Sequence, residues 1–69
     1  MVELILEAIK KAQEKHGEFP ECKKDGYIII AEEFGEIAQS ISDKESIERT
    51  KSEVMDTAVA CLRFLEKHC

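Results

Sequence analysis

Two short groups of acidic residues have the residue types and the spacing of a site for a divalent cation. Within each group two acids are three positions apart, so on a helix they lie on one face. If the groups lie on two antiparallel helices joined at residues 42–45, the four acids pair at matching levels. Clustered carboxylate oxygens suit a hard cation such as Mg²⁺. The acids are Glu33 and Glu36 in the first group and Glu53 and Asp56 in the second.

Each acid also has a simpler interpretation, and these alternatives stay open at the level of sequence. The first group, including Glu32, could be a solvated helix face. Arg49 precedes Glu53 by four positions, which favours an ion pair within one helix. Asp56 lies in an otherwise apolar stretch, where an unpaired carboxylate is costly. It therefore requires a metal ion, hydrogen bonds, or a Lys or Arg from another helix.

The elements that would position these acids are helices. Apolar residues recur at helical spacing in three segments, which predicts helices over about 2–15, 26–41 and 46–67. Gly17 and Pro20 end the first segment, and Asp25 is the expected N-cap of the second. Phe19 and Pro20 are expected to fold back onto the later helices. The predicted fold is all-α: one domain, residues 1–69, with a central antiparallel αα-hairpin.

The second predicted helix is apolar on more than one side, which is typical of a helix buried on two sides. A chain of 69 residues supplies only a thin core of its own. We therefore expect a helical bundle completed by a second copy, in a homodimer or homotetramer. The main apolar stripe of this helix consists of Tyr27, Ile30, Ala31, Phe34, Ile37, Ala38 and Ile41.

Composition excludes several classes of function. The net charge is −5 and no run of Lys or Arg occurs, which argues against nucleic-acid binding. Three cysteines without a CxxC spacing indicate reduced thiols and a cytoplasmic location. Acids interrupt the N-terminal apolar run, so neither a signal peptide nor a membrane span is expected. Lys10, Lys11, Lys15 and Arg63 are expected to be solvated, with the alternative that one or more of them reach phosphate in an assembly. His68 and Cys69 are expected to be frayed.

The order Glu32-Glu33-x-x-Glu36, then Glu53-x-x-Asp56, resembles the EExxE…ExxD signature of the MazG-like, all-α nucleoside triphosphate pyrophosphohydrolases. Residues 53–65 resemble the second motif helix of that family with its apolar continuation. Residues 15–20 resemble the connector of its short members. The resemblance covers most of the chain, and it implies cleavage of a ribo- or deoxyribonucleoside triphosphate to the monophosphate and pyrophosphate. Mg²⁺ is the implied cofactor, with Mn²⁺ as a substitute.

The resemblance also implies roles for individual residues. By position, Glu33, Glu36, Glu53 and Asp56 would be the metal ligands, and Glu32 would support the site. Either Glu32 or Glu36 would accept the proton of the attacking water. Family members assemble helical bundles from two or four subunits, and longer ones carry a further helix and basic residues that meet the phosphates. We expect a second subunit to supply the missing wall here.

Two other functions are compatible with the sequence. The chain could be a non-catalytic helical interaction module that dimerises through its apolar faces and presents acids to a basic partner. A degenerate family member would look the same. Phosphoribosyl-ATP pyrophosphohydrolase activity is a further possibility within the superfamily, although no residue identifies that substrate.

Overall fold

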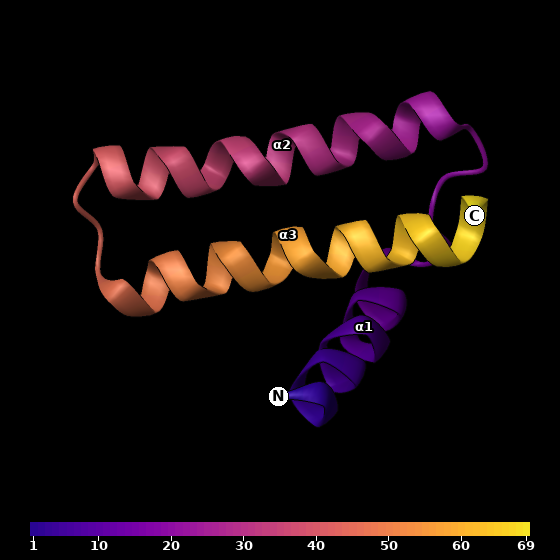
Figure 1. Ribbon diagram of the computed structural model, residues 1–69, viewed down its shortest axis with the longest axis horizontal. Helices are drawn as coiled ribbons and strands as arrows, with labels where there is room; N and C mark the ends of the chain where they lie inside the picture. The colour runs from indigo at the N-terminus through magenta and orange to yellow at the C-terminus, as the bar shows by residue number, and fades with distance from the viewer.

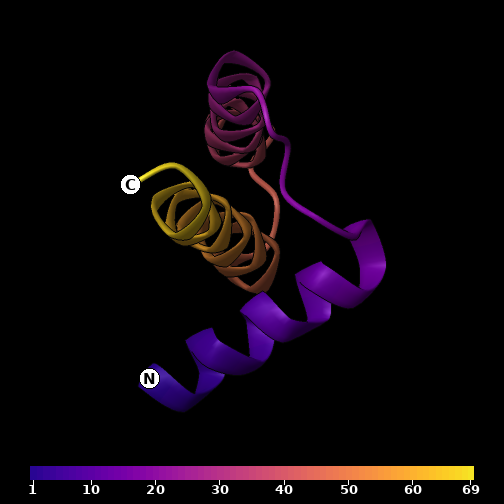
Figure 2. The ribbon, with the colours of Figure 1, turned by 90° about the vertical axis from the view of Figure 1, so that its right-hand side faces the viewer.

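The computed structural model describes residues 1–69 and contains three α-helices and no strand. These are α1 (Val2–His16), α2 (Lys23–Ser42) and α3 (Ile47–His68). Helices α2 and α3 lie side by side and run in opposite directions, and α1 crosses beside α3 (Figures 1 and 2). Helix α3 contacts both of the others, whereas α1 and α2 do not pack on each other directly. The predicted all-α class is confirmed.

The ends of the helices follow local capping chemistry. Helix α2 begins three residues earlier than predicted, with Cys22 as an extended N-cap, so the assignment of Asp25 as N-cap is wrong. Asp25 instead lies in the first turn, where its carboxylate complements the free N–H groups. Helix α3 begins after Ser46, whose hydroxyl accepts a hydrogen bond from the Arg49 N–H at 3.2 Å. Between them, Lys44 adopts a left-handed backbone with φ of 55°.

The small core forms where the connector between α1 and α2 folds back. The Phe19 ring is buried and meets the Phe64 ring edge-on, with centroids 6.1 Å apart. Gly26 of α2 permits this approach, because a Cβ there would lie 2.7 Å from Cε2 of Phe19. Val59 and Ala60 of α3 are the other buried apolar residues. The prediction that Phe19 folds back is confirmed.

Two residues near the end of α3 depart from expectation. Arg63 is only 9% exposed, and its guanidinium donates to Gln13 Oε1 at 3.1 Å and to the carbonyl of Gly17. It also lies 5.5 Å above the Phe19 ring. The expectation of a solvated Arg63 is wrong, because α3 passes beneath the end of α1 at this level. His68 is not frayed, since a ring nitrogen lies 2.9 Å from the Pro20 carbonyl.

Much of the apolar surface of α2 and α3 is uncovered. Phe34 is 59% exposed, and Val54 lies at nearly the same level on α3 with 48% exposed. By helical spacing, Val54 lies nearly opposite Arg63, which is bonded to α1. The uncovered side is thus the flank away from α1. We call it the open apolar face, formed by Tyr27, Phe34, Ile41, Ile47, Val54 and Leu65.

None of the three helices has both the length and the hydropathy needed to cross a membrane.

Candidate metal centre

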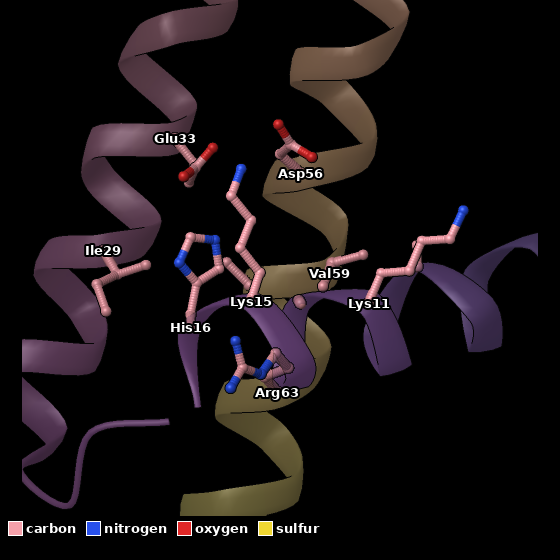
Figure 3. A pocket seen from close by; sticks show the side chains of 11 residues that line it. Lys11, Lys15, His16, Ile29, Glu33, Asp56, Val59 and Arg63 are labelled. Atoms are coloured by element: carbon pink, nitrogen blue, oxygen red, sulfur yellow. The ribbon is translucent and has the colours of Figure 1, made fainter. Parts of the chain in front are cut away.

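The acidic cluster lies between α2 and α3. Oxygen atoms of Glu33, Glu53 and Asp56 lie within 4.8 Å of one another. Glu33 comes from α2, while the other two are neighbours three positions apart on α3. Figure 3 shows Glu33 and Asp56 reaching toward each other from the two helices. Three carboxylates on two facing helices form an oxygen-rich set of the kind that hard divalent cations bind.

Glu53 is the most deeply placed of these acids. Its residue is 5% exposed, and Oε1 lies 3.3 Å from Nε of Arg49. The other oxygen, Oε2, is buried and has no hydrogen-bond partner, and the same holds for Oε2 of Glu33. Buried polar atoms in native proteins are almost always satisfied. Two unsatisfied carboxylate oxygens in one cluster therefore point to a positive ligand between them.

Crowding raises the proton affinity of the whole cluster. Burial, followed by repulsion from Asp56, Glu53 and Glu32, raises the pKa of Glu33. Burial and then Glu53 raise the pKa of Asp56, partly offset by nearby positive groups. The close approach of the Glu36 carboxyl, followed by burial, raises the pKa of Glu53. A bound cation would reverse each of these effects, because it stabilises the ionised carboxylates.

The two remaining acids of the motif lie beside this set. Glu36 is exposed and adjoins Glu53, but it is not one of the three acids whose oxygens converge. Glu32 is exposed, and its negative charge acts on Glu33. The sequence placed the acid pair Glu53 and Asp56 on a buried face, which is confirmed for Glu53 and wrong for Asp56. Asp56 is exposed because it faces the cavity near α1, and Glu53 is the buried acid.

The simpler interpretations of the acids have mixed outcomes. Arg49 forms the expected intrahelical ion pair with Glu53 and a second one with Glu45 at 3.4 Å. All the ion pairs of the molecule involve either Arg49 or Lys67. Asp56 therefore has no Lys or Arg partner from another helix.

A cavity of about 280 Å³ adjoins the cluster. All three helices line it, and Glu33 and Asp56 form part of its wall. Helix α1 contributes Lys11, Lys15 and His16 to the lining of this cavity, and the Lys15 side chain points toward the acids (Figure 3). The sequence left open that these lysines reach phosphate, but it did not predict that they would border the acidic cluster. The spacing of Lys11 and Lys15, one helical turn apart, was the available signal. It could not show which neighbour that turn would face.

Comparisons with known proteins identified no relative: no protein-family model matches the chain, and no match was found among curated proteins or solved structures. The relation to the MazG-like family therefore stays a hypothesis based on the motif. The geometry of the acidic cluster is independent of that hypothesis.

Proposed function

We propose that this chain is a Mg²⁺-dependent nucleoside triphosphate pyrophosphohydrolase, which cleaves a ribo- or deoxyribonucleoside triphosphate to the monophosphate and pyrophosphate. The observation that carries the proposal is the buried, unpartnered Oε2 of Glu53 in a cluster with Glu33 and Asp56. The cluster supports a cation site. The motif resemblance supplies the substrate class and the reaction.

We assign the acidic residues two roles, cation binding and proton transfer. Glu33, Glu53 and Asp56 hold the cation, either Mg²⁺ or Mn²⁺, and Glu36 is the fourth proposed ligand. When bound, the cation neutralises phosphate oxygens and stabilises the charge that develops on the leaving pyrophosphate. Glu32 or Glu36 accepts a proton from the water that attacks a phosphorus of the α–β anhydride. The bond from that phosphorus to the bridging oxygen breaks, and pyrophosphate leaves.

The antiparallel hairpin of α2 and α3 would also mediate self-association. Exposed Phe34 and Val54 lie at nearly the same level on the two helices, so one hairpin could cover another. We propose a homodimer or homotetramer that buries the open apolar face and completes the substrate site. Sedimentation velocity of the wild-type chain and of Phe34→Glu tests this. A monomeric wild type would reject the assembly.

A turnover assay tests the enzymatic proposal. Ribo- and deoxyribonucleoside triphosphates are incubated with the chain and Mg²⁺ or Mn²⁺, and products are separated by chromatography. We expect monophosphate and pyrophosphate, and loss of turnover in Asp56→Asn. Diphosphate with phosphate would indicate a different reaction. Absence of turnover on every nucleotide, with the assembly intact, would contradict the proposal.

The open apolar face favours a second candidate function, a helical interaction module without catalysis. In that case the acids would present negative charge to a basic partner. Asp56→Asn separates the two candidates. It should leave assembly intact in both cases, but only an enzyme loses an activity.

A further inference from the structure

The cavity beside the acidic cluster has two walls of opposite charge. Glu33 and Asp56 form part of one wall, and α1 places Lys11, Lys15 and His16 on the other. Figure 3 shows the Lys15 side chain extending toward the gap between Glu33 and Asp56, with the His16 ring beside it. Lys11 and Lys15 are neighbours on one face of α1, because they are four positions apart. A ligand in this cavity would meet both signs of charge.

The two lysines of this wall form no ion pair with another side chain. The ion pairs of the molecule involve Arg49 and Lys67, so neither Lys11 nor Lys15 has one. Lys15 is nevertheless close enough to lower the pKa of Asp56, although burial and Glu53 outweigh this effect. Arg63 also borders the cavity, but its guanidinium is held by Gln13 and Gly17. The free positive charge of the cavity therefore comes from α1.

The charges and the volume together select a class of ligand. The acidic wall accepts a cation, and the α1 wall accepts an anion, so a phosphate chain complexed with a divalent cation satisfies both. The volume of about 280 Å³ lies close to the lower end of the range of about 300–1,000 Å³ typical of small-molecule sites. The cavity thus has room for a phosphate chain.

We propose that Lys15, with His16 beside it, binds the phosphate chain whose divalent cation is held by Glu33, Glu53 and Asp56. This inference rests on the proposed function and extends it, because it names the residues that position the phosphates. It assigns to α1 a role that the motif, which lies on α2 and α3, does not contain.

The test measures binding of inorganic tripolyphosphate to the full chain by calorimetry in the presence of Mg²⁺. We expect Lys15→Met to weaken binding at least tenfold. The matched control is Lys10→Met, which removes the same charge from an exposed position on α1 that does not line the cavity. Lys10→Met should change the affinity for tripolyphosphate less than twofold. Lys15→Arg should retain most of the wild-type affinity. Mg²⁺ alone should bind Lys15→Met at least as tightly as wild type, because a like charge is removed.

Several results would overturn the inference. One is equal affinity of Lys15→Met and Lys10→Met for tripolyphosphate, and another is absence of tripolyphosphate binding to the wild type. Tighter Mg²⁺ binding in Lys15→Met with unchanged tripolyphosphate affinity would make Lys15 only a counterion of the acids. The proposed function fails separately: intact, Lys15-dependent tripolyphosphate binding without nucleotide turnover rejects hydrolysis and keeps the phosphate site.

Discussion

Gly26 and Gly35 offer a matched pair of substitutions that tests how the core is packed. Both lie within α2, and replacing either by Ala removes a similar helix penalty of about 1 kcal/mol. A Cβ on Gly35 meets no atom within 4 Å, whereas a Cβ on Gly26 lies 2.7 Å from Cε2 of Phe19 and 3.0 Å from Cδ2 of Phe64. Carbon atoms prefer separations of about 3.5–4.0 Å. Gly26→Ala therefore forces the rings apart.

The magnitude follows from the difference between the two variants. The helix term largely cancels, which leaves an overpacking cost of about 1–3 kcal/mol for Gly26→Ala relative to Gly35→Ala. In a domain of this size each kcal/mol shifts the melting temperature by about 4–8 °C. Thermal unfolding followed by circular dichroism measures both variants and the wild type. We expect Gly35→Ala to melt above the wild type and Gly26→Ala to melt below Gly35→Ala. Equal melting temperatures of the two variants would refute the packing of Phe19 beneath Gly26.

Three further predictions concern stability. Arg63→Met removes two charge-assisted hydrogen bonds and a cation–π contact, so we expect a loss of about 2–4 kcal/mol in urea unfolding, whereas exposed Lys51→Met should change stability by less than about 0.5 kcal/mol. Ser46→Ala removes the N-cap of α3 and should cost about 1 kcal/mol in the same assay, and an unchanged urea midpoint would contradict the capping role. The raised pKa values of Glu33, Glu53 and Asp56 mean that the folded chain binds protons more tightly than the unfolded chain. Their contribution therefore destabilises the metal-free chain as pH rises from the ordinary carboxyl pKa through the raised values. Urea midpoints in EDTA should show a smaller decline for Asp56→Asn than for the wild type, and equal declines would contradict the repulsion.

The spacing of the acids predicted that Glu33, Glu53 and Asp56 would lie together, whereas Glu36, which was predicted with them, lies beside the set. Acids three positions apart share a helix face, so Glu53 and Asp56 had to be neighbours once α3 formed. The spacing did not predict their burial, because burial depends on which neighbouring helix each side chain faces. Asp56 faces the cavity beside α1, while Glu53 faces α2 and is covered.

The positions of the basic side chains could not be predicted from the sequence either, because they also depend on how the helices pack. Arginine is usually a surface residue. Arg63 is nevertheless buried, because the end of α1 and the connector pass over it. Lys15 became part of the candidate site through the same crossing of α1. Periodicity describes one helix at a time, and these contacts depend on the angle between helices.

We expect the acids between α2 and α3 to hold a divalent cation. Calorimetric titration of metal-free chain with Mg²⁺, repeated with Mn²⁺, tests it most directly. We expect a saturable site in the wild type that Asp56→Asn weakens at least tenfold. Glu48→Gln, which removes one charge from an exposed position in the first turn of α3, should bind like the wild type. Equal and weak binding by all three proteins would contradict the claim and would leave the acids as a solvated surface.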